Sequence, residues 1–255
     1  LQMFTRSPRT WKSKPLTTEQ VNAFKDAADK NKDISPIIVH APYLANLSSP
    51  SKNTQDASKE LITTELERCQ KLGVPFMIMH LGSGLGSKEE DSIERMAVAL
   101  NEIAKNATGA TKILLENTAG SKNSTGSRLE SIKILYGLLN EKKLFGCCLD
   151  TQHAFAAGYD LRDEDALKDL AEYSEKIREN FIGVIHLNDS KGGLGSGLDR
   201  HENIGRGHIG LSGFRAILSR KEIRHLPMIL ETPVGDYTDF KKDMQTVLKI
   251  LSQTQ

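Results

Sequence analysis

Short apolar runs alternate with amphipathic segments along the whole chain. The runs are continuously apolar, and several are rich in Ile and Val, as expected for strands of a parallel sheet that is buried on both faces. They predict seven strands, at residues 1–5, 36–40, 76–80, 112–116, 145–150, 181–187 and 228–231. The segments between them are predicted to be helices, so the chain reads as a series of βα units.

Two of the predicted helices show a clear helical period, with apolar residues three and four positions apart. One face contains Ile93, Met96, Ala97, Leu100, Ile103 and Ala104, and the other contains Phe240, Met244, Val247, Leu248 and Leu251. The segment Thr17-Thr18-Glu19-Gln20 predicts a capping box at the start of the first helix. Gly73, after Lys71-Leu72, predicts the end of the second helix.

Seven βα units are one short of a (β/α)₈ barrel. Because the sequence opens on a strand, we expect a TIM-type α/β barrel from which the first βα unit is absent. No linker or change in composition divides the sequence, so residues 1–255 are predicted to form a single barrel domain. A doubly wound open sheet is the alternative, but it needs a Gly-rich phosphate loop after an early strand, and the sequence has none.

Composition narrows the function. The chain has 34 basic and 33 acidic residues and a net charge of +1, so any contact with nucleic acid must come from local clusters of cations. Its three cysteines, Cys69, Cys147 and Cys148, lack the C-x-x-C spacing of a thiolate zinc site and fit a reducing compartment. There is no apolar run near 18 residues and no signal-peptide pattern, so we expect an intracellular protein without a membrane partner.

Six of the seven predicted strands carry a His, Asp or Glu at their carboxyl end. These residues are His40, His80, Glu116, Asp150, His186 and Glu231. In a parallel barrel the carboxyl ends of the strands converge on one face, so the six side chains would surround one pocket. The alternative is coincidence, because a single buried histidine is more often a satisfied polar residue than a metal ligand.

Three further candidates lie beside these. His153 follows Asp150 by three residues, and Asp199-Arg-His201 lies in the Gly-rich loop after the strand that ends near His186. Nine nitrogen and oxygen ligands are more than one zinc ion uses, since zinc normally takes about four. They fit a cluster of two or three metal ions, which favours metal-assisted hydrolysis of a phosphate ester.

Several segments resemble signatures of the endonuclease IV family of apurinic/apyrimidinic (AP) endonucleases. They are Asp150-Thr-Gln-His-Ala-Phe-Ala-Ala-Gly-Tyr-Asp160, His186-Leu-Asn-Asp-Ser-Lys191, Asp199-Arg-His201, Leu115-Glu-Asn-Thr-Ala-Gly120 and Ile229-Leu-Glu-Thr232. These segments run in the family's order from Phe4 to Glu231, which is nearly the whole chain.

The resemblance implies three zinc ions, with Mn²⁺ as an alternative at one position. One zinc would bind His40, His80 and Glu116; a second would share Glu116 and add Asp150, His186 and Glu231; the third would bind His153, Asp199 and His201. Glu116 and Glu231 would be catalytic as metal-bound carboxylates, and the nucleophile would be a zinc-bridging hydroxide.

The implied reaction is cleavage of double-stranded DNA on the 5′ side of an abasic site, leaving a 3′-hydroxyl and a 5′-deoxyribose phosphate, as a step of base excision repair. Removal of 3′-blocking groups is implied as well. The resemblance further implies a monomer that works in the nucleus or mitochondrion of a eukaryote or in the cytoplasm of a bacterium.

The chain departs from the family pattern at two places. Gln152 stands where family members usually have Cys, and we expect a packing change there rather than lost metal. The other departure is the absent first βα unit, which puts barrel closure and one DNA-contacting loop in question.

The residues predicted to bind DNA are Arg9, Tyr43, Leu44, Lys12 and Arg206. The family inserts side chains into the duplex from the loops that hold the first three, and the cations would contact phosphates. The alternative for Tyr43 and Leu44 is packing against the barrel rim. Trp11, in contrast, is predicted to lie in the core.

Two other functions stay open on the sequence alone. A sugar isomerase or epimerase on a related barrel would also carry strand-end Glu, Asp and His, but it would normally hold fewer metal ions. A non-catalytic protein that binds DNA lesions would not need a complete ligand set.

Overall fold

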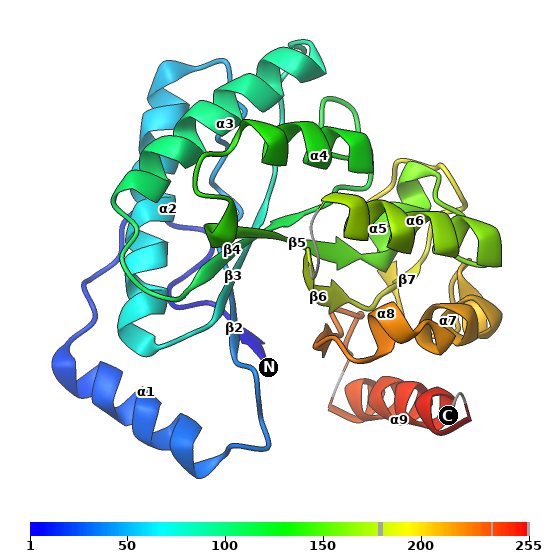
Figure 1. The fold of residues 1–255 in the computed structure, drawn as a ribbon. Helices are drawn as coiled ribbons and strands as arrows, with labels where there is room; N and C mark the ends of the chain where they lie inside the picture. Colours follow the sequence, from blue (N-terminus) through cyan, green and yellow to red (C-terminus); the bar gives the residue numbers. More distant parts are fainter. Residues whose placement is uncertain (178–180, 236, 254–255) are drawn as a thin grey trace. The chain divides into compact units, whose positions relative to one another are not determined.

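The computed structural model describes residues 1–177, 181–235 and 237–253 (Figure 1). The chain divides into two compact units. The first comprises Leu1–Glu116 and Glu130–Gly146, and the second comprises Asn117–Leu129 and Cys147–Gln255. The prediction that residues 1–255 are a single domain stays a prediction.

The first unit contains four parallel strands that are neighbours in chain order: β1 (Gln2–Met3), β2 (Ile38–His40), β3 (Phe76–His80) and β4 (Lys112–Glu116). Its helices are α1 (Thr18–Lys30), α2 (Lys52–Leu72), α3 (Glu89–Lys105), α4 (Leu129–Leu138) and the short 3₁₀ helix η1 (Lys142–Leu144). The middle residues of β2, β3 and β4 are buried, and α2 and α3 pack beside each other (Figure 1). This order of parallel strands and crossover helices is that of repeated βα units.

The second unit contains the parallel strands β5 (Phe145–Asp150), β6 (Ile182–His186) and β9 (Met228–Ile229); β6 pairs with β5 on one side and with β9 on the other. A two-stranded antiparallel ribbon joins β7 (Asp189–Ser190) to β8 (His201–Glu202). The helices are α5 (Thr151–Ala157), α6 (Glu164–Ile177), α7 (Gly210–Ser219), α8 (Lys221–Arg224) and α9 (Tyr237–Gln253).

The apolar pattern located these strands closely. Strands 76–80, 112–116 and 145–150 have the predicted bounds, and the strand predicted at 228–231 ends two residues early. The capping box at Thr17 and the left-handed Gly73 (φ 77°) after α2 are confirmed. The sequence did not predict the β7–β8 ribbon, because strands of two residues are too short to show a period.

The predicted apolar face is buried in full in α3 but only in part in α9. All six apolar residues of the face in α3 are buried, as predicted. In α9 the prediction was partly wrong, since Met244 and Leu248 are exposed and Asp243 is buried. The Asp243 carboxylate accepts hydrogen bonds from the Asn203 side chain at 2.8 Å and from the Ile204 N–H at 3.1 Å. These bonds allow a charged residue to be buried on this face of α9.

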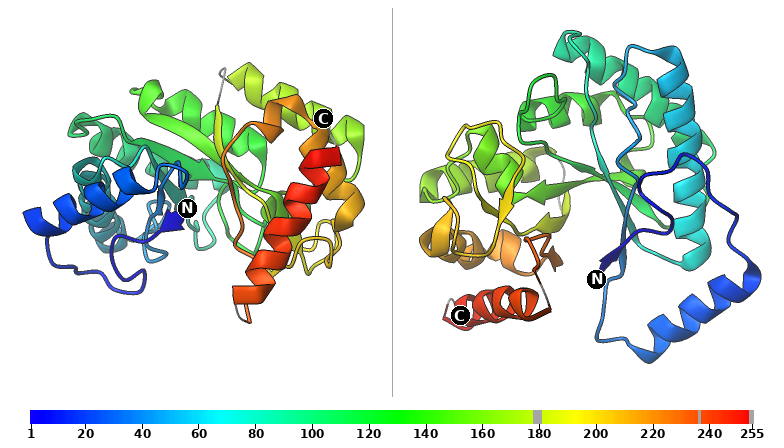
Figure 2. Two further views of the ribbon diagram at one scale, coloured as in Figure 1. Left: turned by 90° about the horizontal axis from the view of Figure 1, so that it is seen from below. Right: turned by 180° about the vertical axis from the view of Figure 1, so that it is seen from behind.

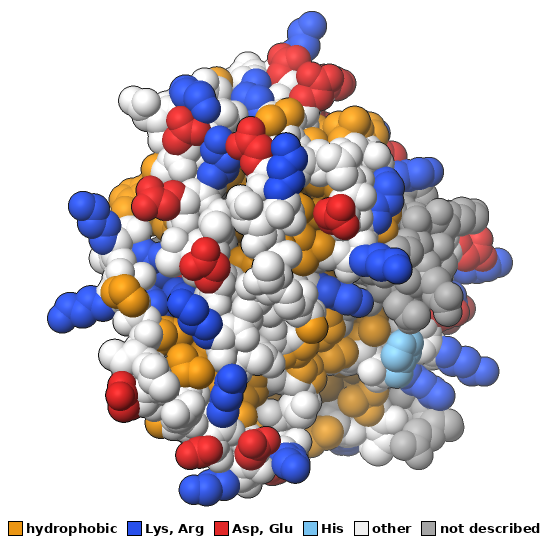
Figure 3. All heavy atoms as spheres, turned by 60° about the vertical axis from the view of Figure 1, so that its left-hand side comes forward, with side chains coloured by type: hydrophobic (Ala, Val, Ile, Leu, Met, Phe, Trp, Pro, Cys, Tyr) orange, Lys and Arg blue, Asp and Glu red, His pale blue; other side chains and the backbone are white. Residues whose placement is uncertain are grey.

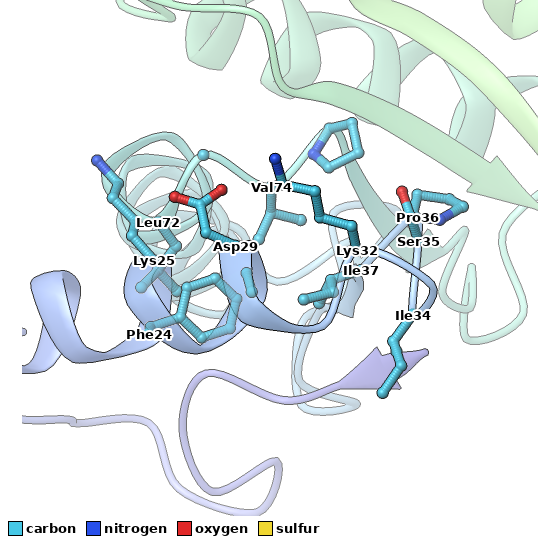
Figure 4. Close-up of a pocket in the computed structure, with 13 residues that line it drawn as sticks. Phe24, Lys25, Asp29, Lys32, Ile34, Ser35, Pro36, Ile37, Leu72 and Val74 are labelled. Atoms are coloured by element: carbon cyan, nitrogen blue, oxygen red, sulfur yellow. The ribbon is translucent and has the colours of Figure 1, made fainter.

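Helix α1 covers the first unit only loosely, because none of its residues is buried (Figure 2). A cavity of about 550 Å³ lies between it and the residues that precede β2 and β3. Phe24 of α1, Ile37 and Val74 line this cavity (Figure 4). Since Ile37 and Val74 come just before the strands, the cavity is at the opposite strand ends from His40 and His80.

Charges of both signs are interspersed on the face drawn in Figure 3, between small hydrophobic patches. This mixture agrees with a net charge of +1. Within the described residues, no helix is both long and apolar enough to cross a membrane.

Candidate metal centre

The first unit brings together three of the predicted ligands, which we call the first ligand group: His40, His80 and Glu116. They stand at the last positions of β2, β3 and β4. Glu116 Oε2 lies 3.2 Å from His40 Nε2 and 3.4 Å from His80 Nε2. His40 and Glu116 are buried, and His80 is partly open to solvent.

The tautomer of His40 shows that this arrangement suits a cation. His40 Nδ1 lies 2.7 Å from the carbonyl oxygen of Ala41, which can only accept a hydrogen bond, so Nδ1 carries the proton. In a neutral imidazole, Nε2 then has a lone pair, and it faces a Glu116 oxygen that also has only lone pairs. Two buried acceptors that face each other need a proton or a metal ion between them, so this contact fits a metal ion bound to Nε2.

The second unit brings together five more predicted ligands, which we call the second ligand group: Asp150, His153, His186, His201 and Glu231. Within it, His186 Nδ1 lies 3.0 Å from Glu231 Oε2 and 3.8 Å from Asp150 Oδ2. His201 Nε2 is also 3.8 Å from Asp150 Oδ2. Asp199, the ninth predicted ligand, is exposed, but its Oδ1 lies 3.4 Å from His153 Nε2 and 3.8 Å from His201 Nε2.

Two histidines of this group repeat the tautomer of His40. His153 Nδ1 lies 2.9 Å from the Asn117 carbonyl oxygen, and His201 Nδ1 lies 3.0 Å from that of Glu231. The lone pair of each Nε2 therefore points at carboxylates. His201 Nε2 is buried and has no hydrogen-bond partner within the described part of the chain. A buried acceptor surrounded by carboxylates is the environment of a metal ligand, so the residues of this group fit a bound cation.

Two asparagines hold the ligands of the second unit in place. The Asn188 amide donates to Asp150 Oδ2 at 2.7 Å and accepts from the Glu231 N–H at 2.8 Å. The Asn117 side chain pairs with the backbone of Asp150 in both directions, at 2.7 and 3.1 Å. Neither asparagine was predicted to have a role. The available signal was that each comes one or two residues after a strand-end ligand, Glu116 or His186.

Asp150 has two functions that are visible in its contacts. Its Oδ1 accepts from the His153 N–H at 2.8 Å and so caps α5, whereas its Oδ2 faces His186 and His201. The cap fixes the short helix on which His153 lies, which explains why a histidine three residues after the strand end reaches the same group.

Gln152, at the position where the family usually has Cys, is fully buried. Its amide Nε2 donates to the carbonyl oxygen of Leu198 at 2.8 Å, directly before Asp199. It also lies 3.4 Å from the Ser190 hydroxyl. The packing change expected at position 152 is thus a hydrogen bond that connects α5 to the segment containing Asp199 and His201.

The residues predicted to bind DNA are placed as follows. Arg9, Lys12 and Arg206 are exposed, and Leu44 is half-buried. Tyr43 is 58% exposed, yet its ring packs against the rings of His40 and His80, with centroids 5.3 and 5.7 Å apart. Tyr43 therefore stands directly over the first ligand group while most of its surface stays available, and its DNA role stays a prediction.

The prediction for Trp11 was wrong. Trp11 is 44% exposed rather than part of the core. It lies in a loop without helix or strand, and its backbone carbonyl accepts a hydrogen bond from Arg6. Trp11 borders a groove together with Leu61 and Thr64 of α2 instead of being enclosed by the core.

The chain matches, over residues 1–253, the family described as the xylose isomerase-like TIM barrel. It is 42% identical to the "Probable endonuclease 4" of Nitrosopumilus maritimus, over 93% of this chain and 86% of the relative. It is 35% identical to the "Apurinic-apyrimidinic endonuclease 1" of Plasmodium berghei, over 99% of this chain and 50% of that longer protein. The crystal structure of endonuclease IV from Thermus thermophilus has a TM-score of 0.83 and 31% identity, and the match covers 99% of this chain and 88% of that one.

These matches define an α/β barrel protein of the TIM type and confirm the predicted fold class. Within this class, the chain belongs to the endonuclease IV family of AP endonucleases.

Proposed function

We propose that this protein is a zinc-dependent AP endonuclease that hydrolyses the phosphodiester on the 5′ side of an abasic site in double-stranded DNA. The observation that carries the proposal is the set of histidine lone pairs that face carboxylates in both ligand groups. The names of the relatives support the substrate, since they are endonucleases and one is named for apurinic/apyrimidinic sites. Epimerases do occur among the similar solved structures, for example a D-tagatose 3-epimerase-like protein with a TM-score of 0.68, but at 21% identity this likeness supports the fold alone.

We propose that the nine ligands hold three zinc ions in the arrangement implied by the resemblance, with Mn²⁺ as an alternative at one position. Bound zinc would lower the pKa of water toward neutrality and neutralise charge on the phosphate. The protein's own part is to orient Asp150 and Glu231 through Asn188, which bonds to the carboxylate of the first and the backbone N–H of the second. It also holds three of the histidines in one tautomer through backbone carbonyl oxygens. No side chain then has to act as a general base. Removal of 3′-blocking groups, the monomeric state and the cellular location stay proposals of the same kind.

The test is metal content combined with nicking of an abasic duplex. We expect about three zinc equivalents per chain and incision 5′ to the abasic site. His201→Ala should lose about one equivalent and most of the activity, and Glu116→Ala should lose more metal, because the resemblance makes Glu116 a shared ligand. His225→Ala is the matched control, since His225 is exposed and bonds to its own helix through the Lys221 carbonyl oxygen. One zinc with full activity would overturn the three-metal proposal, and no incision by the zinc-loaded protein would overturn the function.

A further inference from the structure

A single guanidinium holds both ends of the basic loop, by which we mean residues 6–14 with their four cations. Arg68 of α2 donates from Nε to the Thr5 hydroxyl at 2.7 Å and from Nη2 to the Thr5 carbonyl oxygen. Its Nη1 donates to the Lys14 carbonyl oxygen at 3.0 Å. Arg68 is buried, and the loop between the two anchored residues contains no helix or strand. The fork of Arg68 therefore closes the loop at its base.

A second buried charge on the same helix holds the inside of the loop. Glu65, one turn before Arg68, accepts a hydrogen bond from the Thr5 hydroxyl through Oε1. Its Oε2 lies 3.9 Å from Arg6 Nη1, and Arg6 Nη2 in turn donates to the Trp11 carbonyl oxygen at 2.6 Å. Burial raises the pKa of the Glu65 carboxyl, and the Thr5 hydroxyl and the charges of Arg68 and Arg6 oppose that rise. Arg6 of the basic loop thus favours the ionised form of Glu65, and the Glu65 carboxylate in turn holds the loop.

Arg9 lies between these anchors. It is exposed, it is three residues from Arg6 and two from Trp11, and both of those residues are connected to α2 through Glu65. Lys12 is exposed as well and follows Trp11 directly. A loop without regular structure normally samples many conformations. Binding to DNA would then lose free energy to the conformational entropy of ordering the loop.

We propose that Arg68 and Glu65 are positioning residues that preset the basic loop so that Arg9 and Lys12 meet the DNA in one conformation. This inference rests on the proposed function, because it assigns the loop to DNA. Arginine is required at 68, since its planar fork reaches two carbonyl oxygens and a hydroxyl at once, whereas an ammonium reaches fewer acceptors in fixed directions. Neither residue touches the DNA in this proposal.

The chain contains its own reporter for the loop. Trp11 is the only tryptophan of the sequence, so all indole fluorescence comes from the basic loop. Its side chain borders a shallow groove of about 410 Å³ together with Arg6 and with Leu61 and Thr64 of α2. If the loop leaves α2, the indole leaves this groove, and a soluble quencher such as acrylamide reaches it more often.

The experiment compares the zinc-loaded wild type with Arg68→Lys, Glu65→Gln and the control Glu67→Gln, whose side chain is exposed on the same helix. Without DNA, Arg68→Lys and Glu65→Gln should raise acrylamide quenching of Trp11 about twofold and speed tryptic cleavage after Arg9 and Lys12. On abasic duplex, KM should rise about tenfold and kcat should change little, because the lost interaction orders the loop before binding. Zinc content should equal that of the wild type. Thr5→Val, which removes only the shared hydroxyl, is the milder variant if Arg68→Lys fails to fold.

The two arms separate this inference from the proposed function. If quenching and tryptic cleavage are unchanged in all variants, the positioning role is overturned, whatever the protein cleaves. If Trp11 becomes accessible but KM for abasic duplex stays at the wild-type value, the link between the loop and DNA is overturned. If the wild type does not incise abasic DNA while Arg68→Lys still frees Trp11, the proposed function fails, and with it the assignment of this loop to DNA. Loosening of Trp11 together with a rise confined to KM supports the inference.

Discussion

Two loops of this protein carry exposed basic residues, and the buried side chains that bind the backbones of the two loops have opposite charges. The basic loop of the first unit, residues 6–14, is held by the guanidinium of Arg68. The glycine loop of the second unit, residues 203–210, is held by the carboxylate of Asp189. Asp189 accepts from the N–H groups of Ser190, Gly205, Gly207 and Ile209 at 2.8 to 3.0 Å and is fully buried.

The anchors Arg68 and Asp189 have opposite charges because the two loops turn different backbone groups toward them. The basic loop presents carbonyl oxygens, so only a donor such as Arg68 can satisfy them. The glycine loop presents N–H groups in a concave turn, which forms an anion site. Gly207 makes this turn possible, because a Cβ there would lie 2.4 Å from the Ser190 carbonyl oxygen and 2.5 Å from Asp189 Oδ1. Both solutions hold an irregular loop without a helix or strand of its own.

The largest expected effect is that of Asp189→Asn. The amide nitrogen would face N–H groups where the carboxylate now accepts, which leaves buried donors without partners. We expect a loss of about 3 kcal/mol in the free energy of unfolding, measured by urea denaturation. Asp163→Asn is the control, since Asp163 accepts one N–H, that of Ala166, at an exposed position. Because Asn accepts such a bond about as well as Asp, this variant should lose less than about 0.5 kcal/mol. Equal losses in the two variants would mean that the glycine loop does not depend on this anchor.

The strands and most of the candidate site could be predicted from the sequence. The apolar runs located the strands, and the strand ends located the candidate ligands His40, His80, Glu116, Asp150 and His186, because a parallel strand brings its last residue to a fixed edge. The Asp199-Arg-His201 pair lies beyond any strand end that a period can mark; it was named as a candidate because it lies in the Gly-rich loop after the strand that ends near His186, and the family resemblance supported it.

The loop anchors were not predictable in the same way. Arg68 and Glu65 lie on a helix whose pattern is that of any amphipathic helix, and their partners are 63 and 60 residues away in the sequence. Asp189 belongs to a segment that was recognised as family-like, but its role depends on the backbone direction of residues 205–209, which composition does not encode. Trp11 was misassigned for the same reason, since a lone aromatic residue between cations shows no period.

The second prediction concerns lesion discrimination and separates the two loops by role. An abasic site lacks the base that fills the stack, so inserting a side chain there costs less unstacking than at an intact pair. Arg9→Ala and Tyr43→Ala should lower the ratio of cleavage efficiency on abasic over intact duplex about tenfold, at unchanged zinc content. Arg206→Ala, on the glycine loop, should leave this ratio as it is. On nicked substrates the defect should shrink. Unchanged ratios in Arg9→Ala and Tyr43→Ala would favour rim packing for Tyr43.

Gln152 tests whether a neutral donor can hold a loop segment in place as the charged Arg68 does. Gln152 donates to the Leu198 carbonyl oxygen, as Arg68 does to Lys14, but without a charge. We expect Gln152→Ala to weaken binding of one zinc about tenfold, since support of the segment with Asp199 and His201 is lost. Competition with a fluorescent chelator measures the affinity, and Gln70→Ala on α2 is the control. If Gln152→Ala binds every zinc ion with wild-type affinity, the hydrogen bond from Gln152 to Leu198 is not needed for metal binding.

The smallest expected effect compares the exposed cations of the two loops. Lys12 and Arg206 are each predicted to contact one phosphate, and each contact releases condensed counterions when DNA binds. Affinity for abasic duplex should therefore fall steeply with salt, and Lys12→Ala or Arg206→Ala should each reduce the slope of log K against log salt by about 1. The ratio of abasic to intact binding should not change, because a phosphate contact carries no information on the lesion. The double variant should reduce the slope by about 2 if the two contacts are independent. Binding that does not respond to salt would mean that neither loop meets the DNA backbone, and a change in one variant alone would assign the phosphate contact to that loop.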